Sequence, residues 1–213
     1  YYLSHGCLVA RCVEPVIWHI HALSPASDIL SAYQEVVAAR KPAERIFAFV
    51  LGEIPEDWKN CPASYRFSRA WVPYEDAAVR PVTLDDKALM EACCVVDAEE
   101  SALGKMIAES FMDSFTEHVC GDSVISLLII ENGNAAGFVT GDIDREMNIV
   151  TVEIFVNRRY RGKGYAKRLL SALCATLPDV VYCYSCKKEN VASMNTAKSC
   201  GFVYKGAYLL VDS

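Results

Sequence analysis

The residues most able to do chemistry lie in the segment 156–170, where two glycines separate an apolar stretch from an amphipathic one. Gly162 and Gly164 allow the backbone to turn tightly and to approach a ligand closely. A helix that begins directly after them presents unpaired N–H groups and the positive end of its dipole, which attract anions. The surrounding cations are Arg158, Arg159, Arg161, Lys163, Lys167 and Arg168, with no acid among them. The segment predicts a phosphate site, with a solvated basic helix face as the alternative.

The spacing of this segment differs from that of two common phosphate-binding loops, G-x-x-x-x-G-K-[ST] and G-x-G-x-x-G. Arg161-Gly-Lys-Gly164-Tyr-Ala166 instead resembles the R/Q-x-x-G-x-G/A signature of the GNAT superfamily of acetyl-CoA-dependent N-acetyltransferases. Downstream, Glu189-Asn190-Val-Ala-Ser193 followed by Gly201-Phe202 is similar to the N-x-x-S…G-F segment of the same superfamily. The resemblance covers about residues 77–213 and does not extend to residues 1–76.

The resemblance implies that acetyl-CoA binds as a co-substrate at the glycine segment. Backbone N–H groups from Gly162 to Ala166 would hold the pyrophosphate of coenzyme A, and the end of the preceding strand would pair with the pantetheine arm. Downstream, Asn190 and Ser193 would contact the pantetheine or the adenosine, although Asn190 equally suits the N-cap of a following helix. The implied cofactor-binding residues are Ile154, Val156, Arg161, Gly162, Lys163, Gly164, Tyr165, Ala166, Asn190 and Ser193.

A carboxylate on the strand before the glycines suggests how an amine acceptor is activated. An alkylammonium has a pKa of about 10.4, so it must lose a proton before it attacks a thioester. The superfamily usually places a carboxylate on or beside its fourth strand, and Glu153 is the one ionisable residue in the segment 149–156. The resemblance therefore implies that Glu153 is the catalytic base, directly or through a water. The alternatives are a surface glutamate or a carboxylate that only attracts a cationic substrate, a role for which Asp142, Asp144 and Glu146 compete.

The residue that would protonate the leaving thiolate departs from the family pattern. Many members carry a tyrosine four residues before the G-F pair, where this chain has Ala197. The candidate substitutes are Tyr204, Tyr208, Cys200 and Ser193. We expect an enzyme that moves an acetyl group from acetyl-CoA to a primary amine, on a small molecule or a peptide. The alternative is a non-catalytic acyl-CoA-binding or regulatory module on the same fold.

Composition and charge narrow the remaining classes of function. The 213 residues are 53% hydrophobic, which supplies a real core and argues against a disordered chain. A net charge of −6 argues against a general nucleic-acid or anionic-membrane binder. The longest aliphatic stretch, residues 124–130, is far shorter than the ~18–20 residues of a membrane span. We therefore expect neither a nucleic-acid nor a membrane partner.

The ten cysteines are scattered and do not form a metal or disulfide framework in the sequence. Cys183 and Cys186 have C-x-x-C spacing, but no second pair lies at zinc-ligand distance. We expect small core thiols, no bound metal, no structural disulfide and a reducing, cytoplasmic compartment. The chain begins with Tyr-Tyr-Leu, which suggests a trimmed or processed end.

The elements that must position these residues divide into two regions. Residues 1–76 predict an α/β lobe of unknown role, and residues 77–213 predict a GNAT acetyltransferase domain. The fold class is α/β (α+β), with a mixed, mostly antiparallel sheet flanked by helices. We expect strands at 7–12, 16–22, 46–51, 67–72, 79–84, 124–131, 135–140, 148–156, 180–185 and after 202. We expect helices at 24–40, 85–96, 101–118, 164–177 and 191–199.

Overall fold

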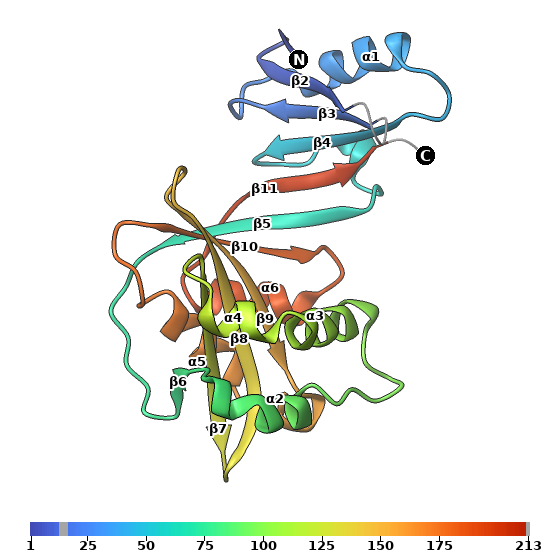
Figure 1. Ribbon diagram of the computed structural model, residues 1–213. Helices are drawn as coiled ribbons and strands as arrows, with labels where there is room; N and C mark the ends of the chain where they lie inside the picture. The colour runs from blue at the N-terminus through green and yellow to red at the C-terminus, as the bar shows by residue number, and fades with distance from the viewer. Residues whose placement is uncertain (13–16, 212–213) are drawn as a thin grey trace. The chain divides into compact units, whose positions relative to one another are not determined.

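The computed structural model describes residues 1–12 and 17–211, and these form two compact units (Figure 1). The first unit comprises residues 1–12, 17–67, 185–194 and 203–211. The second comprises Ser68–Tyr184 and Asn195–Phe202. Residues 185–194 and 203–211, which we expected in the C-terminal domain, therefore cluster with the N-terminal part of the chain. The last strand explains much of this, because it pairs with a strand of the N-terminal part.

The first unit is a mixed sheet with one long helix. Its elements are β1 (Tyr2–Ser4), β2 (Cys7–Cys12), β3 (Ile17–Ala22), α1 (Ile29–Ala39), β4 (Arg45–Leu51), the 3₁₀ turn η1 (Glu56–Trp58), β5 (Ala63–Ala70) and β11 (Val203–Leu210). The strand order is β1-β2-β3-β4-β11-β5, with β3 and β4 parallel and β4 and β11 antiparallel. The strand expected from Val16 begins at Ile17 in the described residues, and Val16 itself lies outside them.

Strand alternation separates the two faces of this sheet. Trp18 and Ile20 of β3 are buried in one core with Ile29 and Val36 of α1. On the other face, the rings of His19, Phe47 and Tyr208 stack across three strands. The helix was predicted to begin at residue 24, and this start was wrong. Helix α1 begins at Ile29, because the side chain of Asp28 accepts the backbone N–H of Ser31 at 3.1 Å and caps it there.

The second unit is built on a sheet of order β10-β9-β8-β7-β6 (Figure 1). Its elements are β6 (Val79–Pro81), η2 (Leu84–Asp86), α2 (Lys87–Cys93), α3 (Ala102–Asp113), α4 (Phe115–Cys120), β7 (Val124–Glu131), β8 (Asn134–Asp144), β9 (Ile149–Val156), η3 (Arg158–Tyr160), α5 (Tyr165–Leu173), β10 (Val181–Lys187) and α6 (Val191–Ser199). Only the last residues of β5, the first of β10 and the end of α6 belong to this unit. Pairing is antiparallel except between β9 and β10. The predicted fold class, a mixed and mostly antiparallel sheet flanked by helices, is confirmed.

The two faces of the second sheet pack against different helices. Phe138 of β8 and Phe155 of β9 are buried with Phe111 of α3 and Phe115 of α4. On the opposite face, a Cβ placed on Gly141 would lie 2.7 Å from Val150 and 3.2 Å from Leu173 of α5. Odd-numbered residues of β9 therefore face α3 and α4, and even-numbered residues face α5.

Several predicted elements in this unit differ from the structure. The strand expected over 79–84 ends at Pro81, and the helices expected over 85–96 and 164–177 are shorter, at Lys87–Cys93 and Tyr165–Leu173. The single helix expected over 101–118 is two helices, because Ser114 leaves the helical conformation (φ −110°, ψ 28°). The hydrophobic periodicity continues through Ser114, so the periodicity did not predict the break. Strand β8 extends through Asp142 and Asp144, which we expected in a loop, because both pair with β9. No helix in the described part of the chain is long and apolar enough to cross a membrane.

Candidate functional site

The turn between β9 and α5 is held open by its two glycines. Gly162 and Gly164 have φ of +79° and +80°, a left-handed conformation that other residues adopt only with strain. A Cβ at either position would meet no atom within 4 Å, so the space outside the turn is open. Gly164 is the N-cap of α5 and provides no side-chain cap. The first N–H groups of α5 therefore remain available to an anion.

The end of β9 leaves one backbone edge beside this turn. Strand β8 pairs with β9 as far as Val156, whereas the ladder between β9 and β10 ends at Val152 and Tyr184. Ile154 and Val156 are half-buried on this stretch. The carbonyl oxygen of Val156 accepts a hydrogen bond from Arg161 Nε at 2.9 Å, which ties the turn to the strand end. An extended ligand could add to the free edge as another strand does.

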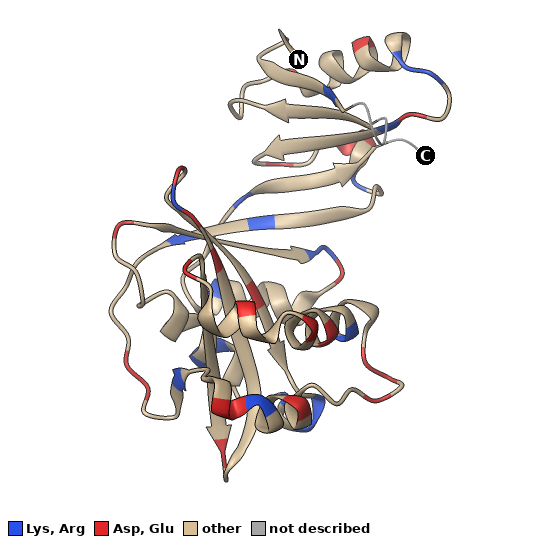
Figure 2. Cartoon of the chain, in the orientation of Figure 1, with Lys and Arg blue, Asp and Glu red and all other residues tan. Residues whose placement is uncertain are grey.

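Most of the cations around the turn are paired with carboxylates from distant parts of the chain. The ion pairs are Arg161 with Glu100 (2.6 Å), Lys163 with Glu131 (3.1 Å), Arg168 with Asp76 (2.6 Å) and Arg158 with Asp97 (3.3 Å) and Glu99. Figure 2 accordingly shows basic and acidic segments interspersed over the second unit. Arg159 and Lys167 have no ion pair within residues 1–12 and 17–211. The predicted cluster of cations without acids is therefore wrong, because the folded chain brings carboxylates to four of the six. The backbone N–H groups, Arg159 and Lys167 are the groups left to attract an anion in the described part of the chain.

Glu100 is a component of the site that the sequence did not reveal. Its side chain is only 2% exposed, and burial alone would raise its pKa. Hydrogen bonds from Arg161 and from the backbone N–H of Ser101 outweigh the burial and lower the pKa of Glu100. A Cβ on Gly104 would lie 2.4 Å from Glu100 Oε1, so this glycine makes room for the carboxylate. Glu100 also lines a cavity of about 80 Å³ with Phe155 and Asn157.

Glu153 lies on the face of β9 that is turned toward α3 and α4. The residue is exposed, yet the protein around its carboxyl group desolvates it and raises its pKa. The nearby charge of Asp142 on β8 raises this pKa further, and His118 on α4 opposes the rise. Asp144 has a structural role, because its carboxylate accepts the backbone N–H groups of Glu146 and Met147 and closes the turn. Of the acids considered, Asp142 is the one whose charge acts on Glu153.

The comparisons with known proteins decide the family. The profile described as "Acetyltransferase (GNAT) family" matches residues 56–202, more than half of the chain. The chain belongs to this family. The predicted resemblance is thus confirmed, and membership supports an acyltransferase activity.

Several solved structures share the GNAT fold at low sequence identity. A GNAT-family acetyltransferase from Colwellia psychrerythraea is 9% identical with a TM-score of 0.59, covering 87% of this chain and 74% of its own. A functionally unknown conserved protein from Staphylococcus epidermidis is 8% identical with a TM-score of 0.56, covering 97% and 90%. A GCN5-related N-acetyltransferase from Sphaerobacter thermophilus is 13% identical with a TM-score of 0.53, covering 96% and 74%. No curated protein sequence matches the chain.

The GNAT signature fits the turn in a second register. Arg159, Gly162 and Gly164 satisfy R-x-x-G-x-G, two residues before the match that ends at Ala166. Both glycines of this earlier register have positive φ, whereas Ala166 lies inside α5. Arg161, the arginine of the later register, is held by Glu100. The signature allows alanine at its last position, so Ala166 inside α5 is compatible with the register predicted from Arg161, and that register stays a prediction.

The remaining predicted residues are distributed between the units. Asn190 and Ser193 belong to the first unit, and Asn190 Oδ1 accepts the backbone N–H of Ser193 at 3.0 Å, as a helix cap does. Ala197 is fully buried and has no proton to give. Burial and then Tyr65 raise the pKa of Tyr204 to about 12, and the Tyr208 hydroxyl pairs with His19 Nδ1.

Five of the ten cysteines behave as the small core residues that we expected. Cys7, Cys93, Cys174, Cys186 and Cys200 are buried. Burial raises the pKa of Cys93 and of Cys174 to about 12, so these thiols stay protonated. Cys200 Sγ lies 3.6 Å from the carbonyl oxygen of Lys167 and 3.7 Å from Ser171 Oγ, which fits a packed thiol. These contacts weaken Cys200 as the missing acid.

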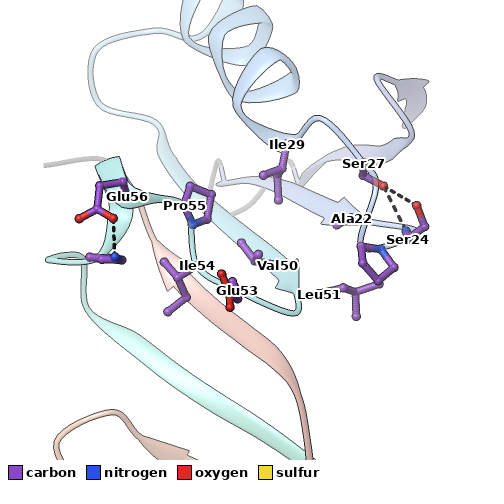
Figure 3. Close-up of a pocket in the computed structure, with 12 residues that line it drawn as sticks. Ala22, Ser24, Ser27, Ile29, Val50, Leu51, Glu53, Ile54, Pro55 and Glu56 are labelled. Atoms are coloured by element: carbon purple, nitrogen blue, oxygen red, sulfur yellow. Dashed lines mark hydrogen bonds and ion pairs between the residues drawn. The ribbon is translucent and has the colours of Figure 1, made fainter.

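A further cavity lies in the first unit, away from the predicted residues (Figure 3). Its volume is about 360 Å³, and it opens beyond the ends of β3 and β4, between Ala22, Val50 and Ile54. Figure 3 shows Ser24 paired with Ser27 and Glu56 paired with a lysine, Lys59. The side chain of Glu53 also lines the cavity, so its lining carries more acidic than basic groups.

The pair between Arg168 and Asp76 anchors α5, and we expect Asp76→Asn to destabilise the protein by about 1–2 kcal/mol at pH 7. Two hydrogen bonds from Arg168 lower the pKa of Asp76 to about 2. The carboxylate therefore stabilises the fold above its ordinary pKa of 3.8, and this contribution is lost as the pH falls from 3.8 to 2. Urea unfolding should show a difference between the two proteins at pH 7 that shrinks at pH 3. An equal difference at both values would contradict the assignment.

Proposed function

We propose that the protein transfers an acetyl group from acetyl-CoA to a primary amine. The observation that carries the proposal is the glycine turn, with an uncapped helix N-terminus beside a strand edge that β10 leaves free, in a member of the GNAT family. The residues that carry out the transfer would lie in the second unit. The N-terminal lobe would be an additional part of the protein that takes no part in the transfer.

The turn would bind the phosphates of coenzyme A through its backbone. N–H groups from Gly162 to Ala166 would bind the phosphates on the open side of the turn, where the dipole of α5 favours negative charge. Arg159 and Lys167 would add long-range attraction, since neither is engaged in an ion pair in the described chain. The pantetheine arm would extend along residues 154–156 and place the thioester near the middle of β9.

Glu153 would then remove the proton that blocks the acceptor nitrogen. The ammonium N–H bond breaks, a carboxyl O–H bond forms, and the free amine attacks the thioester carbonyl. A C–N bond forms, the C–S bond breaks, and the departing thiolate takes up the proton that the acylated nitrogen gives up as it becomes an amide. The raised pKa of Glu153 suits this step because it makes the carboxylate a stronger base than an exposed glutamate.

The test measures binding and turnover separately. We expect calorimetry with acetyl-CoA to show one site. We also expect thiol release when acetyl-CoA is mixed with members of an amine panel: an aliphatic diamine, an amino-acid amide, an aminoglycoside and a short peptide. A Gly52→Ala variant, changed at a turn of the first unit, serves as the control for non-specific loss of active protein. Binding without thiol release from any amine would favour the non-catalytic acyl-CoA-binding module, and absence of binding would refute both functions.

A further inference from the structure

His118 is held in a fixed position on the same side of the second sheet as Glu153. Its ring stacks on Phe111 of α3 with centroids 5.0 Å apart and planes at 18°. Phe111 in turn packs on Phe138 of β8 at 4.2 Å. The backbone carbonyl of His118 accepts a hydrogen bond from Ser126 Oγ on β7 at 2.7 Å. Stacking and this bond together restrict both the ring and the end of α4.

The imidazole has a proton-accepting capacity that the fold does not use. His118 Nδ1 is buried and has no hydrogen-bond partner among the residues that the structure describes. Buried ring nitrogens are normally satisfied, because an unpaired one costs about 1–3 kcal/mol. Among the described residues, no carboxylate or backbone group bonds Nδ1 and so fixes the tautomer through this atom. An unsatisfied buried nitrogen on the face of the sheet that carries Glu153 calls for an explanation beyond packing.

The sheet register connects His118 to Glu153. Ser126, Thr140 and Glu153 are direct neighbours on β7, β8 and β9, and their side chains point to one face. Adjacent strands lie about 4.8 Å apart, so the row from Ser126 to Glu153 spans about 10 Å. His118, fastened to the Ser126 end, lies within electrostatic reach of Glu153. Asp142 is the other charged group that acts on Glu153 from this face.

We propose that His118 is a positioning residue that receives the acceptor's proton from Glu153 during acetyl transfer. The inference rests on the proposed function. In the first step the ammonium N–H bond breaks and an O–H bond forms on Glu153. In the second step that O–H bond breaks as its proton passes to a water between the two side chains, and this water gives one of its own protons to the imidazole, so that an N–H bond forms on His118 and the carboxylate is regenerated. The proton leaves His118 for solvent after the product departs, and Asp142 holds the cationic acceptor without taking the proton.

The kinetic test uses the full chain, acetyl-CoA and the fastest amine of the panel. We expect His118→Gln to lower kcat about 10-fold or more with little change in the KM of either substrate, since the residue acts on proton transfer. Asp142→Asn should instead raise the KM of the amine. His118→Ala leaves a ring-sized space against Phe111, so added imidazole should restore part of kcat. His5→Ala, at an exposed histidine of the first unit, should change neither parameter and show no rescue.

A second measurement needs no acceptor amine. Carbon-13 NMR of the Glu153 carboxyl group should show that its pKa rises in His118→Gln, because the opposing charge is gone, and falls in Asp142→Asn. An unchanged pKa of Glu153 in His118→Gln would overturn the inference whether or not an acceptor is known. If wild-type protein releases no thiol with any amine while this pKa responds, the proposed function fails although the coupling of His118 to Glu153 stands. Normal kcat in His118→Gln would refute the relay and leave the acetyl transfer intact.

Discussion

Acetyl-CoA should no longer bind when Gly164 is replaced by glutamate, with affinity falling at least about 100-fold in calorimetry. The residue has a φ of +80°, where a side chain costs about 1–2 kcal/mol. Nothing lies within 4 Å of the added Cβ, so the new carboxylate enters the open side of the turn. There it would repel the phosphates that the helix N-terminus is expected to attract. The loss should exceed what backbone strain alone produces.

Gly52→Glu is the matched control for this variant. Gly52 has a φ of +81° and also has no neighbour within 4 Å of a Cβ, but it lies in the first unit, directly after β4. The same strain and the same charge are thus introduced outside the unit that holds the glycine turn. We expect this control to bind acetyl-CoA normally. Equal losses in both variants would indicate a general effect on folding, and unchanged affinity in Gly164→Glu would refute the binding site.

Local patterns predicted the second unit well. Strand β7 and helix α6 have the expected bounds, because the apolar run of β7 and the cap at Asn190 are properties of neighbouring residues. Gly162 and Gly164 could likewise be identified from sequence, since their conformation serves the turn itself. The break at Ser114 could not be predicted from the sequence, because Phe111 and Phe115 keep a helical spacing across it. In the structure their rings meet edge to face.

Long-range pairing explains what the sequence did not reveal. Arg161 and Arg168 appeared in the sequence to be unpaired cations. Their partners, Glu100 and Asp76, lie 61 and 92 residues away along the chain. The C-terminal strand β11 was expected in the C-terminal domain, yet it pairs with β4 of the first unit. Such partners come together only when the whole chain folds, so the spacing of neighbouring residues does not predict them. For the same reason the contacts of His118 with Phe111 and Ser126 could be identified only in the structure.

The environment of Glu153 makes a definite prediction about pH. As a base it acts only when ionised, and desolvation together with Asp142 raises its pKa above the ordinary 4.5, against the opposing effect of His118. Wild-type kcat should therefore be lost as the pH falls through this raised pKa. Asp142→Asn removes one cause of the rise and should move the loss to lower pH. A midpoint at or below 4.5 would show that another group is the base.

Glu153→Gln separates the catalytic role from the alternatives, because it keeps the shape of the side chain and removes its basicity. We expect kcat to fall about 10²-fold or more while acetyl-CoA binding measured by calorimetry stays intact. Part of the rate should return as the pH approaches the amine pKa of about 10.4, where the acceptor loses its proton without help. Glu146→Gln, at an exposed acid in the turn before β9, should leave kcat unchanged. If Glu153→Gln raised only the KM of the amine, the carboxylate would attract the substrate and the proton would leave directly to solvent.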